Sequence, residues 1–189
     1  MKKTIFITGA NGFLGSRIVR LAIKKKFRVK AFVRKNSNLD NLKDLNVEIC
    51  HGDLRDQNSI LHHMKGSHII FHVAADYRLW ARKISEIYES NVFGTENILK
   101  VANKLGHEKF ILTSSVATLG TNGDKPVDES SSADFSHMIG DYKKSKYIAE
   151  KIFFEYVRNK QIKGIVLNPS TPIGPGDIKP TPTGRIIFQ

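Results

Sequence analysis

The sequence predicts an α/β protein built on one doubly wound parallel sheet with helices on both faces. Short apolar runs alternate with helical patterns along the 189 residues, as expected for strands that are covered on both sides. The first run leads directly into three glycines, Gly9, Gly12 and Gly15, which open a helical pattern. Because crossovers between parallel strands are right-handed, we expect the strand order 3-2-1-4-5-6.

The expected elements follow the chain in strict alternation. Strands are predicted at residues 4–8, 28–34, 47–50, 68–73, 109–113 and 164–168. Helices are predicted near residues 13–25, 37–44, 56–64, 83–105 and 140–160. The polar segment 117–137 is long enough to be a functional loop. The tail 169–184 holds five prolines and three glycines, so we expect no helix there.

Composition is typical of a globular domain with its own hydrophobic core. Hydrophobic residues make up 40% of the chain and charged residues 25%. The single cysteine, Cys50, excludes an internal disulfide and fits a reducing cytoplasm, where we expect the protein. The apolar run Ile5–Ile7 is too short for a secretion signal and is interpreted as a strand. No run approaches the ~20 apolar residues of a membrane span.

The formal net charge of +12 comes from 30 lysines and arginines against 18 acidic residues. A basic surface attracts phosphates, nucleic acid or acidic lipid headgroups. No nucleic-acid-binding motif accompanies the charge, so the simpler interpretation is a solvated, lysine-rich surface and we expect no nucleic-acid partner. A phosphate-bearing small molecule would gain from the same charge.

The three glycines each have a physical reason in a dinucleotide-binding loop. Gly9 allows a sharp turn, Gly12 lets a pyrophosphate approach the backbone, and Gly15 lets the helix pack close to the strand. The free N–H groups of that helix then face the phosphates. A glycine-rich turn in another kind of α/β protein is the alternative, but the strand before and the helix after favour the dinucleotide site of a Rossmann-type sheet.

The end of the second strand indicates which dinucleotide binds. An acidic residue there selects NAD by binding the ribose hydroxyls, and this chain has Arg34 beside that place instead. An arginine suits a 2′-phosphate through its charge and planar donor fork, so we predict NADP in preference to NAD. Alternatively, Arg34 is a solvated strand end. Asp53 could accept a hydrogen bond from the adenine amino group, and the small Ala74 and Ala75 leave room for the cofactor backbone.

Two residues on one predicted helix suit proton transfer. Tyr142 and Lys146 are four apart and share a helix face. The ammonium is expected to lower the tyrosine pKa from its usual ~10, so that the phenol can act as an acid or base. Ser115 follows the fifth strand, where ligands of such sheets bind, and could hydrogen-bond the same substrate oxygen. This set fits hydride transfer at a carbon that bears a hydroxyl or carbonyl.

Other polar and aromatic groups are less informative. Tyr77, Arg78 and Trp80 follow the fourth strand and either line a substrate site or pack against a further domain. The adjacent His62 and His63 face different ways on a helix and lack ligand-spaced partners, so we predict no metal site.

With these motifs the chain resembles the extended short-chain dehydrogenase/reductase superfamily, the NAD-dependent epimerase/dehydratase family. The resemblance implies Ser115, Tyr142 and Lys146 as a catalytic triad, with Asn91 supporting the lysine through a water. Arg34 matches the arginine of the dihydroflavonol-reductase branch, which uses NADPH. The cofactor contacts that the loop, strand ends and triad imply are Gly9, Asn11, Gly12, Phe13, Leu14, Gly15, Arg34, Asp53, Leu54, Ala74, Ala75, Tyr142, Lys146 and Pro169.

Two stretches, Phe71–Ala81 and Asn168–Gly184, are similar to bacterial hopanoid-associated sugar epimerases, relatives of dihydroflavonol 4-reductase. Members of the family continue past the Thr183-Gly184-Arg185 segment into a smaller substrate-binding domain. We therefore expect residues 1–168 to form the NAD(P)-binding domain and 169–189 to begin a substrate-binding region whose remainder is absent, with Tyr77, Trp80 and Ser115 at the substrate.

Two functions remain open on this resemblance. One is an NADP-dependent oxidoreductase or epimerase acting on a sugar-like or dihydroflavonol-like small molecule. The other is a truncated cofactor-binding module without turnover. The family also implies a homodimer through the helices near 83–105 and 140–160.

Overall fold

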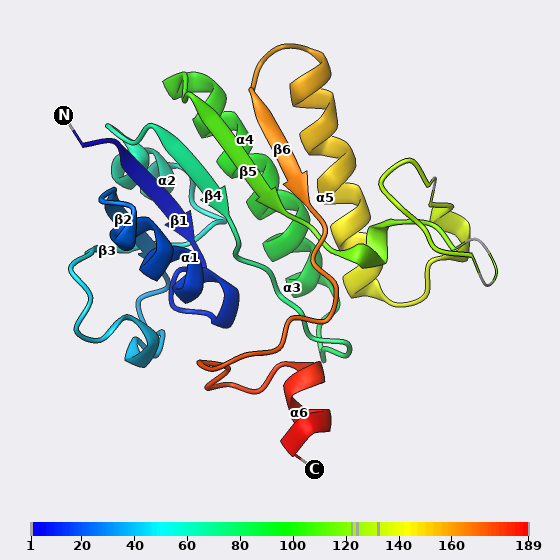
Figure 1. The fold of residues 1–189 in the computed structure, drawn as a ribbon. Coiled ribbons are helices and arrows are strands. Elements are labelled where there is room, and N and C mark those ends of the chain that lie inside the picture. The colour runs from blue at the N-terminus through cyan, green and yellow to red at the C-terminus, as the bar shows by residue number, and fades with distance from the viewer. Residues whose placement is uncertain (1, 122, 124, 132, 189) are drawn as a thin grey trace.

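The computed structural model describes residues 2–121, 123, 125–131 and 133–188. Six parallel strands form one sheet in the order β3-β2-β1-β4-β5-β6, which confirms the predicted order (Figure 1). The strands are β1 Thr4–Thr8, β2 Arg28–Val33, β3 Glu48–His51, β4 Ile69–His72, β5 Lys109–Thr113 and β6 Gly164–Leu167. The α-helices are α1 Phe13–Lys24, α2 Gln57–Met64, α3 Ser85–Tyr88, α4 Gly94–Leu105, α5 Asp141–Arg158 and α6 Pro182–Phe188.

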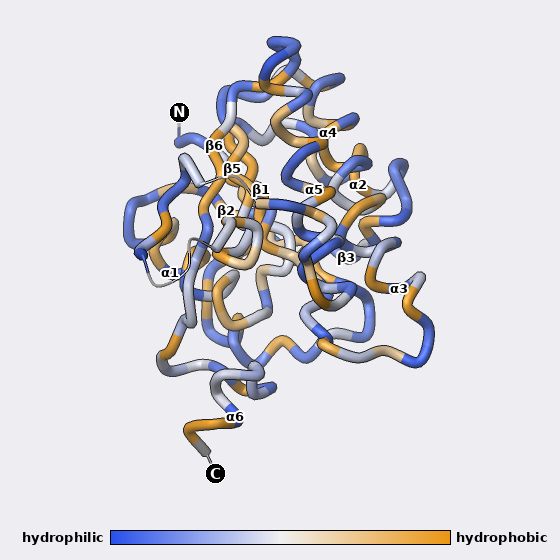
Figure 2. Tube along the Cα trace, turned by 90° about the vertical axis from the view of Figure 1, so that its right-hand side faces the viewer, coloured by the Kyte–Doolittle hydropathy of each residue, from blue (hydrophilic) through white to orange (hydrophobic). Residues whose placement is uncertain are grey.

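The sheet separates two hydrophobic clusters, so helices cover both faces as predicted. On one face Phe6, Ile70 and Phe110 pack against apolar side chains of α2, α4 and α5. On the other face Ile5 and Ile7 pack against α1. In Figure 2 the strands are largely orange, whereas the helices mix orange and blue, as amphipathic helices do.

The outer strand β6 has only one covered face. Val166 packs against the cluster that α5 covers, but Ile165 and Leu167 on the other face are 58% and 44% exposed. Parallel sheets are normally covered on both faces, so this exposed face is unusual.

The helix predicted at 37–44 is wrong. The segment forms one short 3-10 turn, Asp40–Leu42, and Asp44 takes a left-handed φ of 60°. The Asn38 side chain accepts a hydrogen bond from the Asp40 N–H at 2.7 Å and donates to the Asp40 carboxylate at 2.8 Å. Short polar side chains of this kind compete with helical hydrogen bonds for the backbone.

The expectation of no helix before residue 185 is also wrong, because α6 begins at Pro182. Proline is favoured in the first helical turn, where its missing N–H costs nothing. The Thr181 hydroxyl accepts a hydrogen bond from the Gly184 N–H at 3.1 Å and so caps the helix. Figure 1 shows α6 beyond the carboxyl ends of the strands, at the edge of the molecule.

The long helix predicted at 83–105 is present but is wider in its middle. Residues Glu89–Phe93 form a π turn between α3 and α4, and the Gly94 N–H donates to the Glu89 carbonyl five residues earlier. Such turns occur frequently at functional sites because they redirect one side chain. Among the described residues no helix is both long and apolar enough to cross a membrane.

Candidate active site

The carboxyl ends of the parallel strands meet at one edge of the sheet, and most of the predicted site residues follow those ends. Gly9 follows β1, Arg34 follows β2, Asp53 follows β3, Ala74 follows β4 and Ser115 follows β5. Ligands of doubly wound sheets bind at this edge.

The three glycines of the first loop differ in what surrounds them. A Cβ on Gly9 would lie 2.7 Å from Ala74 Cα, and Gly9 also has a left-handed φ of 64°. A Cβ on Gly15 would collide with the Gly9 carbonyl oxygen. By contrast, a Cβ on Gly12 would meet only that same carbonyl, at 3.2 Å. The protein itself therefore requires glycine at 9 and 15, and the space beside Gly12 stays open, which fits an approaching phosphate.

Hydrogen bonds hold the segment after β6 close to the glycine loop. Asn11 donates from its amide to the Asn38 carbonyl at 2.9 Å. The Asn41 amide donates to the Asn11 carbonyl at 3.1 Å and to the Gly176 carbonyl at 3.0 Å. The Arg17 guanidinium donates to the Pro175 carbonyl. Helix α1 and the segment after β6 are thus held together, and Phe13 of α1 lies beside Gly174.

The predicted adenine-end residues are arranged as follows. Arg34 is exposed after β2 and makes no ion pair within the part of the chain that the structure describes. Both carboxylate oxygens of Asp53 are bound by Arg55, with Nη2 2.7 Å from Oδ2 and Nε 3.0 Å from Oδ1. These hydrogen bonds are the main reason that the Asp53 pKa is lowered. Leu54 packs against Gly94, where an added Cβ would lie 3.0 Å from the Leu54 Cβ.

Tyr142 and Lys146 lie in the first turns of α5, as expected, but their electrostatics differ from the prediction. Burial raises the pKa of Tyr142, while a hydrogen bond with Ser115 acts in the opposite direction. The expected lowering by Lys146 is not among the causes of the shift, and the Lys146 ammonium donates to the Thr113 carbonyl at 2.8 Å. Lys146 is 4% exposed, and burial lowers its pKa to about 8.

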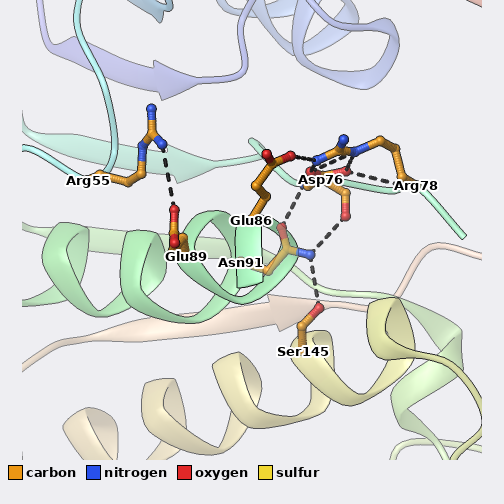
Figure 3. A network of polar contacts seen from close by, with 7 residues as sticks. All are labelled: Arg55, Asp76, Arg78, Glu86, Glu89, Asn91 and Ser145. Carbon is orange, nitrogen blue, oxygen red and sulfur yellow. Dashed lines mark hydrogen bonds and ion pairs between the residues drawn. The ribbon is translucent and has the colours of Figure 1, made fainter. Parts of the chain in front are cut away.

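Asn91 lies in the π turn and is 2% exposed (Figure 3). Its Oδ1 accepts from the Asp76 N–H at 2.7 Å, and its Nδ2 donates to the Asp76 carbonyl at 2.9 Å and the Ser145 hydroxyl at 3.0 Å. Ser145 in turn donates to the Tyr142 carbonyl at 2.7 Å. Asn91 therefore links the segment after β4 to the residue beside Lys146.

The predicted substrate residues lie in the segment after β4. Trp80 is 78% exposed and Tyr77 is 38% exposed. Arg78 is bound to the Asp76 carboxylate, with its Nε 2.9 Å from Oδ1, and to the Glu86 carboxylate at 2.8 Å (Figure 3). Arg78 therefore orders this segment.

A polar cluster that the sequence did not indicate lies beneath Ser115. The Asn168 amide donates to the Ser115 carbonyl at 3.1 Å, to the Thr118 hydroxyl at 2.9 Å and to the Glu150 carboxylate at 3.1 Å. The next residue, Pro169, accepts from the Val116 N–H at 3.2 Å. These contacts fix the loop that carries Ser115. Only the polar end of an apolar strand at Asn168 hinted at them in the sequence.

Within the described ranges no three histidine, cysteine, aspartate or glutamate side chains are grouped to hold a metal ion. The Nε2–H of His63 donates a hydrogen bond to the His51 carbonyl oxygen at 3.1 Å, and its ring packs edge-on against the ring of His62.

Comparison with known proteins identifies the family. Residues 5–189 match the family described as "NAD dependent epimerase/dehydratase family". The chain belongs to that family. The match, the strand order and the loop geometry together confirm an extended short-chain dehydrogenase/reductase fold.

Two relatives illustrate the range of the family. The chain is 44% identical over its full length to a Synechocystis sp. protein named "Putative dihydroflavonol 4-reductase", of which it covers 55%. It is 31% identical to "Sterol demethylase protein B" of Methylococcus capsulatus, with 98% of this chain and 56% of that protein covered.

Solved structures agree on the architecture. The crystal structure of gox2253 superposes with a TM-score of 0.93 at 44% identity, covering 98% of this chain and 57% of that one. A Thermus thermophilus UDP-glucose 4-epimerase in complex with NAD gives a TM-score of 0.85 over 98% of this chain and 60% of its own, but at 19% identity it shows the fold alone. The chain spans a little over half the length of the proteins that it matches.

Proposed function

We propose that the protein is an NADP-dependent oxidoreductase or epimerase that transfers hydride at a hydroxyl- or carbonyl-bearing carbon of a sugar-like or dihydroflavonol-like molecule. The observation that carries the proposal is the placement of three residues at the carboxyl end of β5: Ser115 follows that strand, Tyr142 lies beside Ser115, and Lys146 donates to the Thr113 carbonyl. The names of the matched relatives, which include reductases and epimerases, support the reaction class.

The residues of this chain divide the work as follows. The α1 N-terminus and the open space at Gly12 bind the phosphates. Ser115 donates a hydrogen bond to the substrate oxygen, and the Tyr142 hydroxyl gives or takes the proton at that oxygen. A bound nicotinamide supplies or accepts the hydride. Burial raises the Tyr142 pKa, so in the chain without cofactor the phenol holds a proton at neutral pH but is a weaker acid than an unperturbed tyrosine.

The preference for NADP rests on Arg34. Its guanidinium is exposed after β2, no acidic residue stands in the place that selects NAD, and the planar donor fork suits a 2′-phosphate. Arg55 is committed to Asp53, so it does not replace Arg34 in this role.

The cofactor proposal is tested by thermal shift of this chain with NADPH and with NADH. NADPH should raise the melting temperature more than NADH, and Arg34→Ala should remove most of the difference. Arg28→Ala is the matched control, because Arg28 is an exposed arginine at the opposite end of the same strand. Equal shifts with both cofactors, or equal losses in both variants, would refute the preference for NADP.

A cofactor-binding module without turnover is the second candidate, favoured by the Lys146 ammonium, which is bound to the Thr113 carbonyl, and by the raised pKa of Tyr142. It predicts that NADPH binds while no carbonyl substrate is reduced by the chain, even with Ser115, Tyr142 and Lys146 intact. The absorbance of NADPH, monitored while the chain is incubated with a panel of aryl and sugar ketones, distinguishes an enzyme from a binding module without turnover. A substrate-dependent rate that disappears in Tyr142→Phe would exclude the module without turnover.

Two further expectations belong to the same proposal. A cytoplasmic location accords with the one buried cysteine, Cys50, whose thiol pKa burial raises to about 12. A homodimer through the helices near 83–105 and 140–160 accords with the exposed aromatic rings of Phe93 in the π turn and Phe154 in α5, which are 56% and 39% exposed. Sedimentation velocity measures the proposed dimerisation directly.

A further inference from the structure

A chain of four buried polar residues runs beneath the site, and neither the triad nor the glycine loop accounts for it. Thr8 ends β1, His72 ends β4, and Thr95 and Asn91 lie in α4 and the π turn. Their exposed fractions are 0%, 2%, 1% and 2%. Buried polar groups are costly unless they are paired, and here every link is within hydrogen-bond distance.

The hydrogen-bond partners determine where each proton lies. The Thr8 hydroxyl oxygen accepts from the Val73 N–H at 3.1 Å and the Ala74 N–H at 3.2 Å, so its single proton points to His72 Nδ1, 2.7 Å away. The Thr95 hydroxyl donates to the Asn91 carbonyl at 2.6 Å and must accept from His72 Nε2 at 3.0 Å. His72 is thus neutral, with its proton on Nε2.

The histidine keeps this state over the physiological range. Burial is the main cause that lowers its pKa to about 3, and the nearby charge of Lys146 acts in the same direction. Other groups packed around His72 are the hydroxyls of Thr8 and Thr95 and the ring of Phe110, none of which carries a charge.

The chain leads to the segments that border the nicotinamide end of the site. Asn91 fixes both main-chain polar groups of Asp76, which follows the small residues Ala74 and Ala75, and it binds Ser145 beside Lys146. The residues predicted for the adenine end, Arg34 and Asp53, follow other strands and have no part in it.

We propose that His72 is a positioning residue: through Thr8, Thr95 and Asn91 it holds the end of β1, the segment after β4 and the start of α5 in the arrangement that binds the nicotinamide half of the cofactor. The proposal rests on the proposed cofactor site. It predicts that breaking the chain weakens binding of the whole dinucleotide while leaving its adenosine half unaffected.

The test compares Thr95→Val with Thr95→Ser. Valine keeps the shape and removes the hydroxyl, whereas serine keeps the hydroxyl. Dissociation constants are measured by calorimetry for NADPH and for 2′,5′-ADP, which is the adenosine half alone. Thr95→Val should weaken NADPH binding by about tenfold, as expected for an unpaired buried polar group, and leave 2′,5′-ADP within about twofold. Thr95→Ser should bind both ligands like the unaltered chain.

Two results would overturn the positioning role. One is unchanged NADPH affinity in a folded Thr95→Val protein, and the other is an equal loss for both ligands. An unaltered chain that binds 2′,5′-ADP but gains nothing from the nicotinamide half would also contradict it, whereas a chain that binds neither ligand would refute the proposed function itself.

The proton arrangement has a separate test that needs no cofactor. In ¹⁵N-labelled protein the His72 ring should show an unprotonated Nδ1 and a protonated Nε2, unchanged between pH 5 and pH 8. Phenylalanine at this position, His72→Phe, should remove those signals alone, and His107→Phe should remove a different histidine's signals. A His72 ring that titrates near pH 6 would contradict the assigned chain.

Discussion

The ammonium of Lys146 donates a hydrogen bond to the main-chain carbonyl of Thr113 across 2.8 Å, inside the protein. The charge is therefore held against the end of β5, the strand that leads to Ser115. This placement costs solvation, which is why the pKa of Lys146 falls to about 8.

The first prediction concerns stability against pH. An unfolded lysine titrates near ~10.4, so between about pH 8 and pH 10 the unfolded state binds more protons than the folded state. The free energy of unfolding should therefore rise across that window, by an amount on the order of 3 kcal/mol. Denaturant unfolding of the chain and of Lys146→Met measures this effect. The free energy of unfolding of the unaltered chain should rise relative to that of Lys146→Met as the pH rises. A constant difference would contradict the buried charge.

The second prediction separates the two uses of glycine in the first loop. Gly12 has φ −73° and ψ 174°, which any residue adopts, whereas a Cβ on Gly15 would strike the Gly9 carbonyl. Gly15→Ala should therefore destabilise the fold by roughly 2 kcal/mol or more, and Gly12→Ala by less than about 1 kcal/mol. For cofactor affinity the ranking should reverse among folded proteins. Thermal unfolding measures the stability of both variants, and NADPH titration measures their cofactor affinity. A Gly12→Ala protein as unstable as Gly15→Ala would refute the distinction.

The third prediction concerns the proton donor. Tyr142→Phe removes the hydroxyl beside Ser115 and should lower any carbonyl reduction by ~10²-fold or more, far beyond the loss of NADPH affinity expected from one missing cofactor contact. Stopped-flow kinetics measures the rate of carbonyl reduction, and equilibrium titration of the same preparations measures the affinity for NADPH. Tyr156→Phe on the same helix is the control, because Tyr156 packs against the core away from the site. Similar rates in the two variants would argue against Tyr142 as the acid.

The fourth prediction follows from the exposed face of β6. Replacing Ile165 and Leu167 with lysine should reduce self-association beyond the proposed helix-mediated dimer without loss of stability, because both side chains are largely exposed. Val166→Lys, one residue between them, should instead prevent folding, since Val166 packs against the core. Sedimentation velocity with circular dichroism checks both. Undiminished association in the double variant would mean that another surface is responsible.

The sheet and the places of Ser115, Tyr142 and Lys146 in its elements could be predicted because they depend on local patterns. Apolar runs, glycine spacing and the four-residue step from Tyr142 to Lys146 are all contained within single segments. The short turn at Asp40–Leu42 and the helix at Pro182 were missed because side-chain hydrogen bonds from Asn38 and Thr181 decide them.

The electrostatics and the buried hydrogen-bond chain could not be predicted for a different reason. The pKa of Tyr142 depends on how deeply the folded protein buries it, and Lys146 turns to a carbonyl that no spacing rule selects. The link from Thr8 to His72 depends on the register of two parallel strands, in which those two residues are directly paired. A histidine at the end of an otherwise apolar strand was the only visible signal.

The segment after β6 returns across the molecule toward α1 (Figure 1), where Arg17 of α1 donates to the Pro175 carbonyl and Asn41 of the turn Asp40–Leu42 donates to the Gly176 carbonyl. The stretch of chain that leads to α6 is therefore anchored on the helix whose first turn would receive the phosphates. We expect a ligand that tightens that turn to restrain this stretch as well, and by linkage any such coupling must be equal in the opposite direction. The glycine loop and the residues beyond 176 are thus held by the same hydrogen bonds. A substitution of Asn41 should therefore alter both cofactor affinity and the position of α6.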